Sequence, residues 1–406
     1  MTIVEAKPLG QLLRRPPRYG LNAAAVQLAP GVPTYIRITD IDEYGRFAPD
    51  PRVGVAHPKA LNYRIGTGEL VFARTGASVG KSYLYDPRDG ELVYAGFLIN
   101  IAPDPKLLNP KYLSLFAQSK EYWDWISRTS VRSGQPGVNG REYAQLPVPR
   151  PYIEMQNAIA DAISDVDDLI SALERSIAKK QAILQGMMQQ LLTGRTRLPG
   201  FTHPWSTTTL GAVGSFLKGR GVKRDDVRSM GIRCIRYGEI YTSFHDYTAD
   251  VRSYVPPDVA ATALPLRTGD ILFAGSGETR DEIGTCVAYV GPTPAVAGGD
   301  VIVLRGNQCN SIFLALLVNA PEVVRQKARA GQGDAVVHIY SQALAAIEVR
   351  LPCRPEQDAI AGVIVDADCE IGLLSRRLAK ARDVKQGMMQ ELLTGRTRLP
   401  LEESGE

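Results

Sequence analysis

A block of sequence that occurs twice is the feature that most limits what this chain can fold into. Residues 185–199 read QGMMQQLLTGRTRLP and residues 386–400 read QGMMQELLTGRTRLP, so the copies differ only where Gln190 becomes Glu391. Gly186 recurs as Gly387, 201 residues later, which is close to half of the 406-residue chain. Self-similarity at a fixed period is the signature of a repeated architecture. The sequence therefore predicts two copies of one unit, each a globular part followed by a near-identical helix.

Shorter matches at the same offset lie outside the block. Residues 68–73 (GELVFA) correspond to 269–274 (GDILFA), and residues 156–160 (QNAIA) correspond to 357–361 (QDAIA). Between these anchors the two halves diverge strongly. Selection for two different targets would keep the frame and vary the interior, and drift would give the same pattern.

The globular parts, residues 1–150 and 201–351, contain short β-type runs bounded by Gly, Pro and Asp. The pattern predicts strands at 35–42, 70–74, 82–85, 271–274, 286–290 and 301–304, and helices near 110–118 and 311–319. The predicted fold class is α+β, with a compact, irregular β-sheet and helices in each globular part.

Each globular part is followed by a heptad pattern, in residues 151–200 and again in 352–406. A helix over 159–191 would be about 50 Å long at ~1.5 Å per residue. Two such helices in one chain are expected to pair as an antiparallel coiled coil, which gives the duplication a pseudo-two-fold symmetry; a zipper between two chains is the alternative. The predicted helix interface consists of Ile163, Ile170, Ile177, Leu184, Met187, Leu191, Ile364, Ile371, Leu378, Met388 and Leu392.

Composition excludes several classes of protein. Hydrophobic residues make up 44% of the chain and charged residues 22%, as in an ordinary globular protein. No apolar run approaches a membrane span and the N-terminus lacks a signal-peptide pattern, so a cytoplasmic protein without membrane contact is expected. The five cysteines show no C-x-x-C spacing, and the four histidines are scattered. No metal site is therefore expected.

Three segments resemble catalytic or cofactor motifs, and the repeat argues against each. Residues 75–82 (TGASVGKS) nearly form a phosphate-binding loop, but the other copy keeps the glycine and loses the lysine. Residues 109–112 (NPKY) resemble a methyltransferase box, yet the other copy retains only a helix-capping Asn. The Gly275-Ser276-Gly277 run has Arg280 where a dinucleotide fingerprint needs glycine. A turn, a cap and a loop explain these segments, and no catalytic residue is expected.

Basic and polar loops occur at matching places in both halves. Arg, Lys, Asn and Gln are the side chains that grip phosphates and pair with base edges. A solvated loop explains any single one of these residues, but the recurrence of the set favours contact with double-stranded DNA. The candidate DNA-binding residues are Arg74, Lys81, Arg128, Arg132, Gln135, Asn139, Lys218, Arg220, Lys223, Arg280, Arg325, Lys327, Gln332 and His338.

With these features the chain resembles the specificity subunits of type I restriction–modification enzymes. The resemblance rests on the repeated block, on the segment from Leu198 to Trp205, on 235–240 (IRYGEI), on 269–272 (GDIL), and on Gln357 at the start of the second helix. One departure is Met155, because the corresponding position in the second copy is Glu356.

The resemblance implies target-recognition domains at 1–150 and 201–351, and spacer helices at 151–200 and 352–406. Each domain would bind half of an asymmetric, bipartite DNA sequence, and the helices would set the distance between the halves. The chain itself would be non-catalytic and hold no cofactor. Two methyltransferase subunits would dock on it, a restriction/translocation subunit would join through the complex, and S-adenosylmethionine and ATP would be bound by those partners. The alternatives are a stand-alone bipartite-site DNA-binding protein, a specificity subunit of a related restriction system, and a coiled-coil scaffold.

Overall fold

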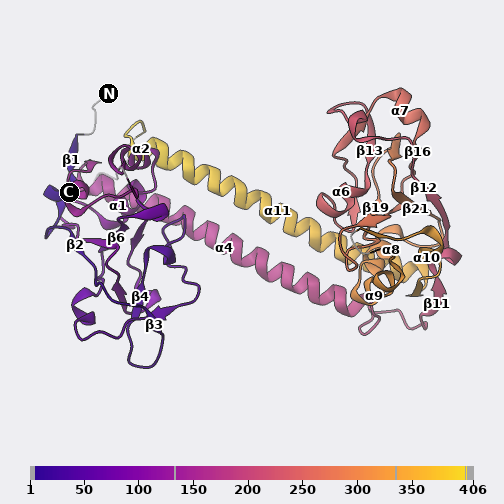
Figure 1. The fold of residues 1–406 in the computed structure, drawn as a ribbon, viewed down its shortest axis with the longest axis horizontal. Helices are drawn as coiled ribbons and strands as arrows, with labels where there is room; N and C mark the ends of the chain where they lie inside the picture. The colour runs from indigo at the N-terminus through magenta and orange to yellow at the C-terminus, as the bar shows by residue number, and fades with distance from the viewer. Residues whose placement is uncertain (1–4, 132–133, 334–335, 398, 400–406) are drawn as a thin grey trace, which may run out of the picture. The chain divides into compact units, whose positions relative to one another are not determined.

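The computed structural model describes residues 5–131, 134–333, 336–397 and 399, and these fall into two compact units. Unit 1 contains residues up to Arg175 together with those from Ser375 onward, and unit 2 contains Ser176–Leu374. Two long helices, α4 (Ile153–Leu191) and α11 (Arg354–Leu393), each contribute to both units (Figure 1). No described helix is long and apolar enough to cross a membrane.

Within each unit a stretch of α4 packs against a stretch of α11. In unit 1, Asp167 forms an ion pair with Lys385, and Glu174 forms one with Arg382. The residue numbers therefore run in opposite directions along the two helices. In unit 2 the corresponding pair joins Lys180 to Glu370. The predicted antiparallel pairing within one chain is therefore confirmed.

The residues of the predicted helix interface are buried to different extents. Ile163, Ile170, Leu191, Ile364, Ile371 and Leu392 are buried, whereas Ile177, Leu184, Met187, Leu378 and Met388 are only partly covered. Leu392 and Leu393 join the unit 1 core, and Leu191 and Leu192 join the unit 2 core. Each repeated block thus anchors one end of a long helix in a globular part.

Glycines end both helices as the sequence predicts. Gly194 has φ of 69° and Gly395 has φ of 70°, a left-handed conformation that glycine adopts without steric penalty. The N–H groups of these glycines donate to the carbonyls of Leu191 and Leu392, which satisfies acceptors at the helix ends.

Unit 1 is built from two four-stranded sheets and one two-stranded sheet. The first sheet has the order β2-β9-β6-β7 and the second has the order β3-β5-β4-β8, while β1 pairs with β10. The strands are β1 Ala6–Pro8, β2 Arg18–Tyr19, β3 Val26–Gln27, β4 Thr34–Ile36, β5 Val53–Gly54, β6 Leu70–Ala73, β7 Ser82–Leu84, β8 Leu92–Tyr94, β9 Leu98–Ile101 and β10 Pro147–Pro149. The α-helices are α1 Pro110–Phe116, α2 Lys120–Thr129 and α3 Gly140–Ala144.

Unit 2 repeats this plan with additions. Its sheets have the orders β12-β21-β17-β19-β14 and β15-β13-β20-β16, and β11 pairs with β23 and β18 with β22. The strands are β11 Ser206–Thr209, β12 Ser215–Lys218, β13 Ile232–Ile235, β14 Tyr247–Thr248, β15 Ser253–Val255, β16 Leu264–Pro265, β17 Ile271–Ala274, β18 Ser276–Gly277, β19 Cys286–Tyr289, β20 Ala295–Ala297, β21 Val301–Arg305, β22 Val337–His338 and β23 Glu348–Leu351. The shorter helices are α5 Leu210–Val213, α6 Tyr237–Thr242, α7 Pro257–Thr262, α8 Ser311–Val318, α9 Pro321–Ala330 and α10 Ser341–Ala345.

The α+β fold class is confirmed, and one predicted strand is shorter than expected. The run predicted at 35–42 ends as a strand at Ile36, and Ile38–Asp40 forms a 3₁₀ turn. The turn forms because the buried Asp40 carboxylate accepts hydrogen bonds from the Arg37 backbone N–H (2.8 Å) and guanidinium (2.7 Å). An apolar pattern alone does not reveal this local competition.

Equivalent hydrogen bonds in the two units join each globular part to the start of its long helix. The buried Gln156 accepts from the Asn109 backbone N–H at 2.9 Å, and Gln357 accepts from that of Asn310 at the same distance. The Asn109 side chain also caps α1, which confirms the capping interpretation of the NPKY segment. These bonds fix the direction in which each helix leaves its globular part.

Candidate nucleic-acid interface

One backbone frame occurs in both units at the end of a central strand. In unit 1, Thr75 forms a β-bridge with Gly137, and the Val138 N–H donates to the Arg74 carbonyl at 2.8 Å. In unit 2, Ser276 pairs with His338, and the Ile339 N–H donates to the Gly275 carbonyl at 3.0 Å. Every one of these partners is displaced by the same 201 residues. The turn after the strand and the loop before a short helix therefore meet in the same way twice.

The unit 1 frame brings together three of the predicted residues. The Arg74 guanidinium lies over the Tyr19 ring, with 4.9 Å between its carbon and the ring centroid. Gln135 is exposed and lies next to Gly76, where an added Cβ would come within 3.1 Å of its side-chain nitrogen. Asn139 caps α3 by accepting from the N–H groups of Arg141 and Glu142.

The unit 2 frame carries different side chains. The Ser276 hydroxyl and His338 Nδ1 lie 2.9 Å apart in a hydrogen bond, and Gln332 exchanges backbone hydrogen bonds with His338. Arg280 is exposed and donates to the Gly333 carbonyl at 3.4 Å. The frame is thus constant and its polar side chains differ between the units.

A basic segment adjoins the unit 2 frame. Lys218 ends β12 opposite Ile302, and the next residue, Gly219, donates to the Val301 carbonyl. The Gly275 N–H donates to the Asp300 carbonyl, so both turns contact the start of β21. The predicted residues of this segment, all exposed, are Lys218, Arg220 and Lys223.

Other predicted residues lie outside these frames. Lys81 donates to the Ile41 carbonyl at 3.1 Å, and the exposed Arg128 donates to a carbonyl of its own helix α2. Arg325 is exposed on α9. Arg132 lies outside the described residues.

Lys327 needs a correction, because it is not an exposed cation. Its side chain is 1% exposed, and its ammonium group donates to the Gly284 carbonyl at 2.8 Å. Burial lowers the pKa of Lys327. In unit 1 the Tyr122 hydroxyl donates to the equivalent carbonyl, that of Gly80. Lys327 therefore fills a structural position, and its ammonium group is not available to DNA.

Two exposed aromatic residues beside Arg74 were not predicted. Tyr19 is 45% exposed and Phe97 is 58% exposed, and the Phe97 carbonyl accepts from the Arg74 N–H. The second copy has Lys218 and Asp300 at the equivalent strand positions, with offsets of 199 and 203 residues. Because these offsets differ from 201 residues, an alignment of the two halves at a fixed offset of 201 does not pair these residues.

The titratable groups of the described residues do not assemble into a metal site: no group of three His, Cys, Asp or Glu side chains could hold an ion there. Cys234 and Cys286 are buried, and burial raises the pKa of each thiol to about 12. These two thiols are therefore not activated nucleophiles.

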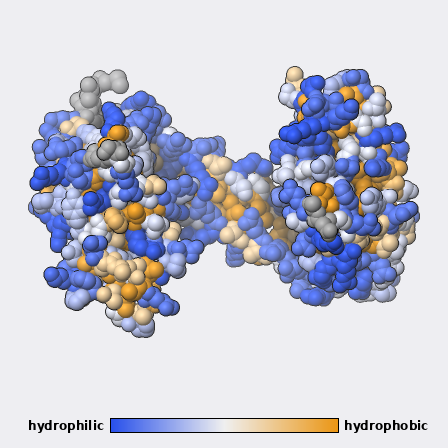
Figure 2. Space-filling model, viewed as in Figure 1, coloured by the Kyte–Doolittle hydropathy of each residue, from blue (hydrophilic) through white to orange (hydrophobic). Residues whose placement is uncertain are grey.

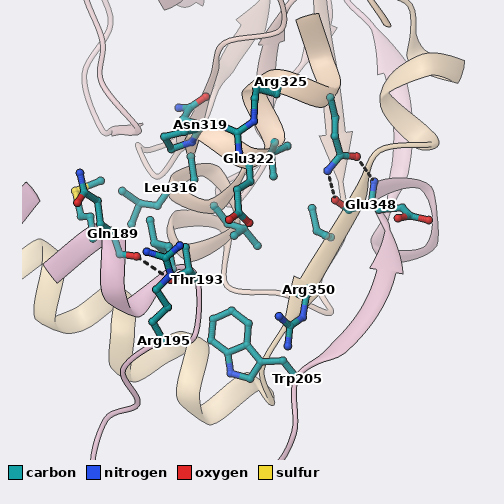
Figure 3. Close-up of a pocket in the computed structure, with 18 of the residues that line it drawn as sticks. Gln189, Thr193, Arg195, Trp205, Leu316, Asn319, Glu322, Arg325, Glu348 and Arg350 are labelled. Atoms are coloured by element: carbon teal, nitrogen blue, oxygen red, sulfur yellow. Dashed lines mark hydrogen bonds between the residues drawn. The ribbon is translucent and has the colours of Figure 1, made fainter. Parts of the chain in front are cut away.

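A second surface feature is a cavity of about 720 Å³ within unit 2, where the repeated block meets α8, α9 and β23. Its lining includes the apolar side chains of Met188, Leu192 and Leu316. Figure 3 shows Arg195, Arg350 and Trp205 at one end, and Arg325 and Asn319 at the other. Six residues of the block line the cavity, and the second copy retains the identity of each: Gln185, Met188, Gln189, Leu192, Thr193 and Arg195.

Sequence comparison relates part of this duplicated architecture to a known family. Residues 55–185 match the family described as the type I restriction modification DNA specificity domain. This segment of the chain is therefore similar to a DNA specificity domain.

Individual relatives point to the same family. The MjaVIII type I restriction enzyme specificity subunit of Methanocaldococcus jannaschii is 20% identical over 349 residues, 82% of this chain and 80% of that protein. A putative MjaX specificity subunit from the same organism is 23% identical over 359 residues, 83% of this chain and 80% of that protein. The solved S subunit of the M. genitalium type I system superposes with a TM-score of 0.61 over 95% of each chain at 14% identity, which shows the fold. The chain is therefore similar to type I restriction–modification specificity subunits in sequence and in fold.

Proposed function

We propose that this chain is the DNA specificity subunit of a type I restriction–modification complex and reads an asymmetric, bipartite target. The observation that carries the proposal is the repeated frame, which places Arg74 and Gln135 in unit 1 where unit 2 has Gly275 and Val336. A constant backbone with varied polar side chains is what two half-sites of different sequence require. Phosphate contacts from exposed Lys and Arg would position the DNA, and the frames would discriminate bases.

The chemistry in this proposal belongs to partner subunits. Methyltransferase subunits would bring S-adenosylmethionine and the methyl-transfer site, and a restriction/translocation subunit would bring ATP hydrolysis. This chain would bind DNA, hold the partners and select the site.

Two equivalent docking surfaces for methyltransferase subunits are supported by the repeat. Ile183 and Val384 are equivalent positions just before the two blocks, and they are 51% and 46% exposed. Figure 2 shows apolar side chains on the surface of the α4–α11 helix pair. Contiguous apolar surface on a water-exposed helix is typical of a protein interface. The near-identical blocks that follow these two positions fit two identical partners.

The helices would set the spacing between the half-sites. At ~1.5 Å per residue a continuous helix such as α4 is roughly 60 Å long. Buried hydrogen-bonded glutamines at Gln156 and Gln357 tie a globular part to the start of each helix. Rigid joints would transmit helix length into a defined separation.

Methylome sequencing tests the proposal. A host that expresses this chain with its neighbouring partner genes should carry methylation at one bipartite motif with two different halves, and deletion of this chain should remove it. Methylation that persists without the chain would contradict the proposal. DNA binding at a bipartite site without co-purifying partners would indicate a stand-alone DNA-binding protein.

A further inference from the structure

Arg74 is held in a fixed position by contacts on three sides. Its backbone N–H donates to the Phe97 carbonyl at 3.0 Å, and its carbonyl accepts from the Val138 N–H at 2.8 Å. Its guanidinium stacks on Tyr19, whose hydroxyl in turn accepts from the Gly140 N–H at 3.1 Å. Such stacking orients a guanidinium. The side chain is thus positioned before any ligand binds.

The donors of this guanidinium have no acceptor in the part of the chain that the structure describes. Over residues 5–131, 134–333, 336–397 and 399, no hydrogen bond or ion pair involves the Arg74 side chain. Other arginines at the sheets are engaged: Arg15 holds Glu69, and Arg305 holds Asp270. Arg74 therefore does not serve the fold as those residues do, and its donors are free to bind a ligand.

We propose that Arg74 reads a guanine in the major groove of the half-site that unit 1 contacts. The inference rests on the proposed function and names the base that one residue selects. A planar arginine fork matches the N7 and O6 acceptors of guanine, and this is the commonest specific contact between proteins and DNA bases. Gly275 occupies the equivalent position in unit 2, so the second half-site is read without this contact.

The Arg74→Lys variant separates base reading from phosphate binding. Lysine keeps the charge, which serves a phosphate, but lacks the planar fork that pairs with guanine. The complete complex should be assayed for methylation rate on duplexes that vary every base pair of both half-sites. We expect Arg74→Lys to lose about tenfold to hundredfold of its discrimination at one G·C pair in one half-site only. Discrimination in the other half-site should stay within about twofold of wild type.

Variants of Tyr19 test the stacked geometry. Tyr19→Phe keeps the ring and should keep most discrimination, whereas Tyr19→Ala should reduce it at the same base pair as Arg74→Lys. Lys218→Ala is the matched control, because Lys218 occupies the strand position of Tyr19 in unit 2. Its loss of an exposed cation should lower overall affinity but leave base discrimination in the first half-site unchanged.

Two results would overturn the inference. One is wild-type discrimination in Arg74→Lys. The other is an Arg74→Ala variant that weakens binding to all sequences equally and lowers the salt dependence by about one counterion, which is the signature of a phosphate contact. Failure of the proposed function is distinguishable, because the wild-type complex would then show no defined motif at all.

Discussion

The buried Asp270 carboxylate accepts two hydrogen bonds from the Arg305 guanidinium, at 2.9 Å from Nε and 2.6 Å from Nη2. The equivalent carboxylate in unit 1, Glu69, is held by Arg15 from a different segment, with Asn100 as a further donor. Glu69 and Asp270 directly precede β6 and β17, the central strands that lead to the candidate interface. In each unit an arginine neutralises the equivalent buried carboxylate, but the two arginines come from positions that do not correspond. The halves have therefore diverged around one common frame.

Removal of the Asp270 carboxylate should destabilise unit 2. Asp270→Ala leaves the mostly buried Arg305 without its partner, and loss of one partner of a buried pair costs roughly 3 kcal/mol. Urea unfolding followed by circular dichroism should show a lower midpoint. The matched control is Asp124→Ala, which breaks the exposed pair with Lys120 and should change the midpoint little. Equal midpoints for the two variants would contradict the stabilising role of Asp270.

Acidification should weaken unit 1 through Glu69. Burial alone would raise the pKa of this carboxyl, but hydrogen bonds and charge from Arg15, with bonds from Gly66 and Asn100, lower the pKa overall. A carboxyl whose pKa is lower in the folded state stabilises the fold above its unfolded value of about 4.3 and loses this contribution as pH falls through the folded pKa. Below that value, the free energy of unfolding should fall less steeply with pH in Glu69→Gln than in wild type. Parallel pH profiles would refute the assignment.

The features that sequence predicts well here are local or periodic. The heptads predicted α4 and α11, Gly194 and Gly395 predicted their ends, and Asn109 predicted a helix cap. The repeat also predicted that residues 75–82 form a turn leading into a strand, and β7 begins at Ser82.

The features that sequence did not predict depend on long-range contacts. Thr75 and Gly137 are 62 positions apart, and nothing in either segment indicates that they pair. Sequence places Lys327 with the exposed basic residues, since composition cannot show that one cation of the group turns inward to a buried carbonyl. Tyr19 and Phe97 were missed because insertions shift their offsets, so the strand register was needed to align them with Lys218 and Asp300.

The buried position of Lys327 predicts a substitution without effect on DNA. Lys327→Met should leave DNA affinity within about twofold of wild type, because a side chain shielded from solvent cannot contact phosphate. Arg325→Ala removes an exposed cation two residues away on α9, and this comparison variant should weaken binding if α9 faces the DNA. A large loss of affinity in a folded Lys327→Met protein would restore Lys327 to the interface.

Lys327 should also shape the alkaline side of the stability profile. Burial lowers the pKa of its ammonium group in the folded state, so the folded chain binds fewer protons than the unfolded chain between the two pKa values. Stability should therefore rise as pH increases toward the unfolded value of about 10.4. Unfolding midpoints measured as pH rises toward that unfolded value should show this rise in wild type, and Lys327→Met should remove it.

The equivalent positions Ile183 and Val384 predict the number of bound partners. Ile183→Glu or Val384→Glu places a charge on one apolar docking surface, and each variant should bind one methyltransferase subunit where wild type binds two. Native mass spectrometry of the reconstituted complex measures this directly. Gln181→Glu, an exposed polar position on the same helix, serves as the control. Two bound subunits in the double variant would place the docking surface elsewhere.

Helix length should determine the spacing of the DNA target. One heptad inserted into both helices, after Arg175 in α4 and after Leu374 in α11, preserves the flanking ion pairs Lys385–Asp167 and Lys180–Glu370. The insertion adds about 10 Å of helix at ~1.5 Å per residue. This length corresponds to roughly 3 base pairs at ~3.4 Å each. Methylome sequencing should then find the same two half-sites with a longer spacer. A heptad inserted into α4 alone would take the helices out of register, and it should abolish methylation. If the double insertion methylates the original spacer, the helices do not set the distance between the half-sites.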